Sequence, residues 1–189
     1  MLWGFRVDTN NNSGLGHVSR MLSIAEVLKK KEEIVFIVNN VNDSHCSHIK
    51  NLNYRFLESR SLSFMLDVCL LDGYFFKSKE LEFLRNKSKK IIQIDDFDNN
   101  FKYTDQTINF LSKGAENVVV SNKFFENDFF KIKKNVSNIL ITFGMADNTN
   151  ATLLTLNAIK IIETYIKANI YISLPTRNKY YKKIRNSIF

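Results

Sequence analysis

Short apolar runs alternate along the chain with stretches in which apolar side chains recur at helical spacing. The runs predict strands at 2–8, 34–38, 68–72 and 91–95, with weaker candidates at 107–111 and 118–120. Helical spacing predicts helices at 16–30 and at about 78–86. Nearly continuous apolar strands that alternate with helices are typical of a parallel sheet covered on both faces. With right-handed crossovers, the pattern predicts an α/β fold with a Rossmann-like, doubly wound parallel sheet.

A polar and basic stretch at 131–135 interrupts this pattern. Beyond it we predict, in order, a strand at 138–144, a helix at 151–165, a strand at 170–174 and a helix at 178–187. Two domains are therefore expected, residues 1–134 and residues 135–189. Because roughly 55 residues are few for an open sheet with helices on both faces, we expect the second domain to be truncated, the start of a longer α/β domain.

Composition restricts the class of protein. The 189 residues are 44% hydrophobic, which is enough for one full core. No apolar run approaches the ~20 residues that a membrane span needs, and the N-terminus lacks the features of a signal peptide. Cys46 and Cys69 do not form a disulfide framework, and Cys69 lies in an apolar run that predicts a buried thiol. We therefore expect a cytoplasmic protein without a membrane partner.

The net charge of +8, from 27 basic and 19 acidic residues, allows two interpretations. A basic surface could attract nucleic acid or another polyanion. Alternatively, the lysines lie on solvated faces. We favour the second interpretation, because the short basic runs lie near predicted element ends and form no single block. No nucleic-acid partner is expected, and the sequence does not predict the oligomeric state.

Polar residues follow the predicted strands at their carboxyl ends. They are Asp8, Asp72, Asp95 and Asp96 in the first domain and Asp147 in the second, where Gly144 directly follows the strand. In open α/β sheets, ligands bind beyond the carboxyl ends of the strands. We expect these residues to converge on one cleft, which the 144–147 loop faces from across the domain interface.

The loop after the first strand carries the strongest chemical signal. Gly14 and Gly16 allow close approach of the backbone to a ligand and positive φ angles, and helix N-terminal amides favour anionic groups. His17 stands at the start of the helix, where an imidazole can take a proton from water. The pattern is not the dinucleotide fingerprint, because the third glycine is missing. A Gly-x-Gly turn that only joins a strand to a helix stays an alternative.

The other candidate residues each have a structural alternative. Tyr74 could be a packed aromatic residue at the rim of the sheet. Asp95 and Asp96 could bind a cation, although such a pair more often caps a turn or pairs with a basic residue. Arg6 could form a structural ion pair with one of the aspartates. The segment 45–48 holds two histidines and a cysteine, but its spacing does not favour a metal site, and no metal is expected.

Several motifs in order resemble one known family. They are Arg6-x-Asp8, Gly14-x-Gly16-His17-x-x-Arg20, Asp72-x-Tyr74, Ile94-Asp95-Asp96, and Ile139–Gly144 with Asp147. Together they resemble the UDP-2,4-diacetamido-2,4,6-trideoxy-β-L-altropyranose hydrolases of pseudaminic acid biosynthesis and their spore-coat-polysaccharide relatives. The resemblance extends over essentially the whole chain.

The resemblance implies a two-domain GT-B-like fold and a reaction in which water attacks the anomeric carbon and UDP leaves. It implies that His17 is the base that activates water and that Tyr74 lines the sugar site. The loop from Gly144 to Asp147 is expected near the diphosphate, without a metal or other cofactor. The remaining motif residues, Arg6, Asp8, Gly14, Gly16, Arg20, Asp95 and Asp96, are expected in the substrate site.

The chain departs from the family at two points. Met145 stands where the family usually has a second glycine, and its side chain could crowd a phosphate. The family chain also continues beyond residue 189, with most of the uridine contacts in that part. The leading hypothesis is therefore a UDP-sugar hydrolase, incomplete or complemented elsewhere. The alternatives are a sugar-nucleotide glycosyltransferase of the same fold and a non-catalytic remnant or interaction module.

Overall fold

A computed structural model describes residues 1–9, 15–74, 76–95, 102–109, 118–121, 124, 134–144, 147–176 and 178–187. The chain divides into two compact units, Met1–Asn127 and Asp128–Phe189.

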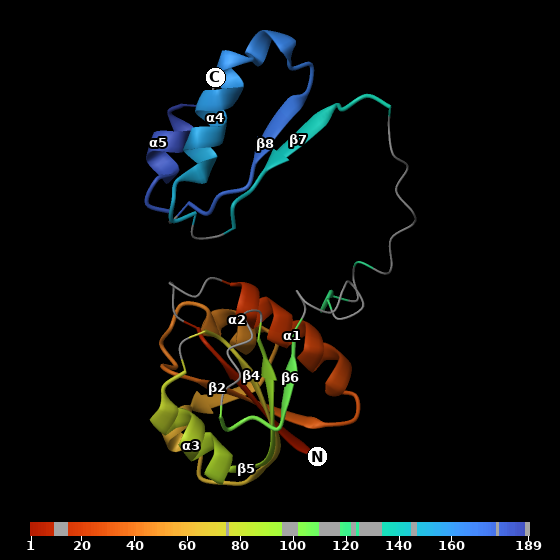
Figure 1. Cartoon of the computed structure of the whole chain (residues 1–189), viewed down its shortest axis with the longest axis vertical. Helices are drawn as coiled ribbons and strands as arrows, with labels where there is room; N and C mark the ends of the chain where they lie inside the picture. The colour runs from red at the N-terminus through yellow and green to blue at the C-terminus, as the bar shows by residue number, and fades with distance from the viewer. Residues whose placement is uncertain are drawn as a thin grey trace. The chain divides into compact units, whose positions relative to one another are not determined.

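The first unit is built on a six-stranded parallel sheet (Figure 1). Its strands are β1 (Leu2–Val7), β2 (Glu33–Val38), β3 (Arg55–Glu58), β4 (Leu66–Asp72), β5 (Ser88–Ile94) and β6 (Gln106–Ile108). The spatial order is β3-β2-β1-β4-β5-β6, and all neighbouring strands are parallel. The strand order reverses between β1 and β4, and open α/β sheets bind ligands at such a switch point. The predicted α/β fold with a Rossmann-like parallel sheet is confirmed at this level.

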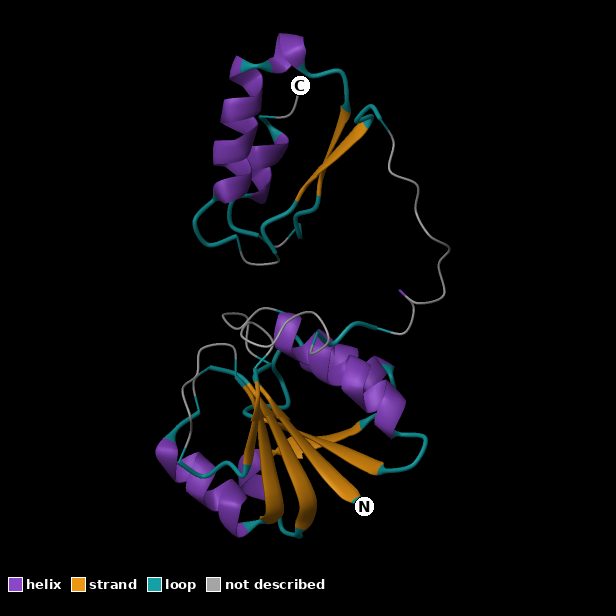
Figure 2. Ribbon diagram, turned by 45° about the vertical axis from the view of Figure 1, so that its right-hand side comes forward, coloured by secondary structure: helices purple, strands orange, loops and turns teal. Residues whose placement is uncertain are grey.

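Helices cover both faces of this sheet (Figure 2). On one face, α1 (Gly16–Leu28) and α2 (Cys46–Asn51) bury Val18, Met21 and Ile49 against Phe5 and other strand residues. On the opposite face, α3 (Ser78–Asn86) buries two leucines in a second apolar cluster. Because successive strand residues point to opposite faces, the two layers fix which side of the sheet each polar residue reaches.

The structure differs from the predicted elements at three places. The pattern gave no sign of α2 or β3, because both are short and α2 buries only two of its six residues. The predicted strand at 118–120 is absent: these residues are described, and none of them lies in a strand. The strand predicted at 107–111 lies at 106–108, and the residues beyond 109 in that prediction are outside the described part.

The second unit contains a two-stranded parallel sheet, β7 (Asn138–Ile141) and β8 (Asn169–Ile172). Two helices accompany it, α4 (Ala151–Ile161) and α5 (Tyr181–Arg185). Its small core contains Ile141, Leu153, Leu156 and Ile184. The β-α-β-α order predicted for this region is present, with shorter elements than expected.

None of the helices in the described part of the chain is both long and apolar enough to cross a bilayer.

Both cysteines are expected to resist thiol reagents in the folded protein. Cys46 and Cys69 are buried free thiols, and burial raises the pKa of Cys46 and raises that of Cys69 to about 12. Little reactive thiolate therefore forms at pH 8. Ellman's reagent should label neither residue in the native protein and both in guanidinium chloride. Rapid labelling of native Cys69 would contradict the buried position given by β4.

Candidate functional site

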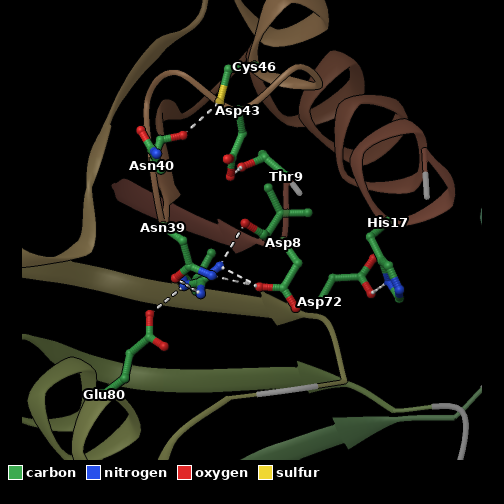
Figure 3. Close-up of polar contacts among 11 residues, drawn as sticks. Asp8, Thr9, His17, Asn39, Asn40, Asp43, Cys46, Asp72 and Glu80 are labelled. Atoms are coloured by element: carbon green, nitrogen blue, oxygen red, sulfur yellow. Dashed lines mark hydrogen bonds and ion pairs between the residues drawn. The ribbon is translucent and has the colours of Figure 1, made fainter. Parts of the chain in front are cut away.

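The ends of β1 and β4 place two carboxylates on opposite faces of the sheet. Val7 and Asp72 are register partners, so the side chain of Asp72 points to the same face as Val7, toward α1. Asp8 follows Val7 and points to the other face, toward α3. Figure 3 shows the two carboxylates near one another, with His17 beside Asp72 and Glu80 on the far side of Asp8.

On the α1 face, Asp72 is bonded by two residues of one helix. Nδ1 of His17 lies 2.7 Å from Oδ1 of Asp72. Arg20 donates from Nη2 to the same oxygen at 2.6 Å and from Nε to Oδ2 at 2.8 Å. His17 and Arg20 are three positions apart and therefore lie on one side of the helix. The Asp72 side chain is 0% exposed and that of His17 6%.

This geometry fixes the hydrogen-bonding role of each imidazole nitrogen. An ionised carboxylate can only accept hydrogen bonds, so Nδ1 of His17 carries the proton that Asp72 accepts. Nε2 then carries the lone pair in the neutral ring and is the nitrogen left for a ligand. A carboxylate that holds a histidine in this tautomer is a recurring arrangement in enzymes that use histidine as a general base.

His17 lines a cleft of about 560 Å³. The cleft is formed by the first half of α1, by Tyr74 after β4, and by residues 119–121 and 124. The ring of Tyr74 meets that of His17 edge to face, with 4.5 Å between ring centroids. Gly16 and Arg20 also line the cleft. The structure thus brings together four of the predicted site residues: Gly16, His17, Arg20 and Tyr74.

On the α3 face, Arg6 is the centre of a buried polar network. Its Nε donates to Oε1 of Glu80 at 2.6 Å, and its Nη1 donates to the carbonyl oxygen of Val7 at 2.7 Å and to Oδ1 of Asp8 at 3.3 Å. Nη2 donates to Oδ1 of Asn39, whose Nδ2 donates to Asp8 (Figure 3). The Arg6 side chain is 1% exposed. Arg6 therefore forms structural ion pairs with Asp8 and Glu80, as the alternative interpretation expected, and it does not line the His17 cleft.

Asp8 has one carboxylate oxygen engaged and one that is not. Oδ1 accepts from Arg6 and Asn39, whereas Oδ2 is buried without a hydrogen-bond partner among the described residues. A Cβ atom on Gly73 would lie 2.7 Å from this oxygen, so the glycine is needed to make room for Asp8. Asp8 stays a candidate for substrate binding, on the opposite face of the sheet from His17.

The other predicted residues of the first unit lie as follows. Gly16 begins α1. A positive φ was expected for it, but its φ is not positive. A Cβ atom at this position would meet nothing within 4 Å, so the described residues leave room for a side chain. Asp95 is buried directly after β5, and its amide donates to the carbonyl oxygen of Ile108 at 3.0 Å. Gly14 and Asp96 lie outside the described residues.

In the second unit, Asp147 caps α4. Its Oδ1 accepts from the amide of Ala151 at 2.8 Å and its Oδ2 from the amide of Thr152 at 3.1 Å. Gly144 lies between β7 and this loop with a φ of +73°, a conformation that favours glycine. The α4 amides that were expected near a diphosphate are therefore occupied by a carboxylate of the chain itself.

Replacing Asp147 by alanine is expected to destabilise α4 by about 1 kcal/mol, because two backbone amides lose their acceptor. Amide hydrogen exchange over 151–161 should accelerate in the variant, while exchange in β4 stays unchanged. Replacing the exposed Asn169 by alanine provides a control in the same unit. Unchanged protection of α4 in Asp147→Ala would show that the cap contributes nothing.

The segment 45–48 does not assemble a metal site. The rings of His45 and His48 are 6.4 Å apart between centroids, and no group of three potential metal ligands occurs among the described residues. His45 is buried before α2, and His48 is exposed on it.

Asp72 was expected at the cleft but without a role, and Asn39 and Glu80 of the buried network were not predicted. Asp72 was visible as a polar residue that ends an apolar strand, but nothing local indicates that its partners lie on the first helix. No protein-family model matches the chain, and no curated protein matches it significantly.

Proposed function

We propose that the chain is a hydrolase that releases UDP from a UDP-2,4-diacetamido-2,4,6-trideoxyhexose, with His17 as the general base. The observation that carries the proposal is the 2.7 Å contact between His17 Nδ1 and Asp72 at the wall of a cleft. It leaves Nε2 of His17 as the basic nitrogen at the cleft. The choice of substrate rests on the resemblance of the ordered motifs to the pseudaminic acid hydrolases.

The reaction needs one water and one base. A water oxygen bonds to the anomeric carbon as the bond from that carbon to the UDP oxygen breaks, and UDP leaves with the electron pair. The water proton passes to Nε2 of His17, and Asp72 stabilises the imidazolium that forms. The products are the free sugar, UDP and a proton that is returned to solvent.

Two serines on the cleft wall and the N-terminal end of α1 support a sugar nucleotide at this position. Hydroxyl and amide groups of a sugar can bond to Ser19 and Ser23, which also line the cleft, and its ring can contact Tyr74. The first turn of α1 has no side-chain cap among the described residues, and such amides favour an anionic group. We propose that the diphosphate lies toward this end.

The GT-B-type arrangement belongs to the same proposal. β7, α4, β8 and α5 would be the start of a nucleotide-binding domain, whose strand and helix order matches the expected one. Because Asp147 occupies amides at the start of α4, a diphosphate there would have to displace a carboxylate. The proposed activity therefore depends first on the residues of the first unit.

The test compares UDP release by the wild-type chain, His17→Ala and His48→Ala. The control variant removes an exposed histidine of α2 that has no place in the cleft. Wild type and His48→Ala should release UDP at equal rates, and His17→Ala should be at least about 10²-fold slower. Release by His17→Ala at the wild-type rate, or no release by the wild type, would overturn the proposal. Release that needs an added acceptor would instead indicate a glycosyltransferase.

A further inference from the structure

We propose that Arg20 is a positioning residue that holds Asp72 in place for His17 and opposes a second positive charge on the imidazole. The inference rests on the proposed function of His17 and assigns Arg20 a role other than the substrate binding that the sequence motif implies.

Arg20 and His17 both bond the carboxylate of Asp72. Arg20 bonds both oxygens of Asp72, from Nε to Oδ2 at 2.8 Å and from Nη2 to Oδ1 at 2.6 Å. Two parallel hydrogen bonds from a guanidinium fix the plane of a carboxylate. Oδ1 is therefore held where Nδ1 of His17 donates to it at 2.7 Å. Without Arg20, the side-chain hydrogen bond left among the described residues to fix the carboxylate would be the one from His17.

The charges of Arg20 and Asp72 also act on His17. Asp72 carries one negative charge, and Arg20 already neutralises it. Nη2 of Arg20 is only 3.5 Å from Nδ1 of His17, so a protonated His17 would place a second positive charge beside the guanidinium. Like charges at this separation disfavour the charged form of the titrating group. Arg20 thus opposes protonation of His17, which must be neutral before it accepts the proton from water.

Among the described residues, Asp72 is the other charged group that faces His17, and its negative charge favours the imidazolium that Arg20 opposes. Asp72 faces the ring from β4, Arg20 faces it from α1, and Tyr74 packs against its edge. Across the cleft, the described residues 119–121 and 124 are two valines, a serine and a phenylalanine. Removing the charge of Arg20 would leave Asp72 to face His17 alone, which favours the imidazolium.

The test uses two variants. Arg20→Met removes the positive charge and keeps a long, unbranched side chain. Arg20→Lys keeps the positive charge but lacks the guanidinium that makes two hydrogen bonds to Asp72. In Arg20→Met, the acidic limb of the kcat/KM profile for UDP release should move upward by about one to two pH units. KM should change less than about threefold. Arg20→Lys should recover most of the shift in pH but not the full kcat. A KM raised tenfold or more with an unchanged pH profile would overturn the proposal and indicate substrate binding.

A second measurement does not depend on turnover. The imidazole resonances of His17 in the free protein, followed by NMR, should titrate at higher pH in Arg20→Met than in the wild type. Those of the exposed His48 should not move, and the fluorescence of Trp3 should confirm an intact first unit. An unchanged His17 titration would refute the role of Arg20. Shifted resonances with no UDP release by the wild type would sustain the role of Arg20 and reject the proposed hydrolase.

Discussion

Replacing Arg6 by methionine is expected to lower the free energy of unfolding of the first unit by about 3–5 kcal/mol. Arg6 lies between the sheet and α3, where its guanidinium bonds Asp8, Asn39 and Glu80 and packs over the ring of Phe76 at 5.0 Å. Methionine fills much of the same volume, so a cavity is not the main cost. The cost arises because Asp8 is left as a buried carboxylate with no cation paired to it among the described residues.

The measurement is urea unfolding followed through Trp3, which is the single tryptophan and lies on β1 beside Phe5. Arg60→Met serves as the matched control. Arg60 also forms an ion pair, with Glu58, but its side chain is 84% exposed, and such pairs contribute about 0–1 kcal/mol. Equal stabilities of the two variants would show that the Arg6 network is not structural.

Replacing Asp72 by asparagine is expected to reduce kcat for UDP release by about 10²–10⁴-fold. An asparagine amide can donate to Nδ1 of His17, which places the ring proton on Nε2 and removes the lone pair from the cleft. The amide also loses the charge that stabilises the imidazolium. KM should change little, because Asp72 is fully buried and does not line the cleft.

Asp67→Asn is the control for this substitution. Asp67 lies on the same strand at its opposite end, where Lys89 and the amide of Leu2 hold its pKa below the ordinary value. That variant should retain wild-type kcat. If Asp72→Asn also retained wild-type kcat in a folded protein, His17 would not depend on Asp72 for its tautomer.

The parallel sheet could be predicted because β1, β2 and β4 are mostly apolar and β5 ends in an apolar run at 91–94. Strands covered on both faces have this composition whatever their neighbours are. β3 could not be predicted, because at the edge of the sheet three of its four residues are only half buried and Arg55 is exposed. The pattern of apolar residues in a segment indicates how buried that segment is. At the edge of a sheet, burial depends on which other strands and helices pack there, and the segment itself does not encode this.

The candidate site could be predicted only in part. His17 was visible because its place after a Gly-x-Gly loop is a local feature of the sequence. Its contact with Asp72 spans 55 positions and follows from the pairing of β4 with β1, which no local pattern encodes. For Arg6, the sequence left an ion pair and a substrate contact open. Its burial beside Glu80, which lies on α3, favours the ion pair.

The most direct test of the central claim, attack of a His17-activated water at the anomeric carbon, is to run the reaction in ¹⁸O-labelled water. The account predicts that the wild-type chain places one ¹⁸O atom in the freshly released sugar and none in UDP, and that His17→Ala releases almost no product. Label in the β-phosphate of UDP would place the attack at phosphorus and contradict the account. The absence of any turnover by the wild type would contradict it equally.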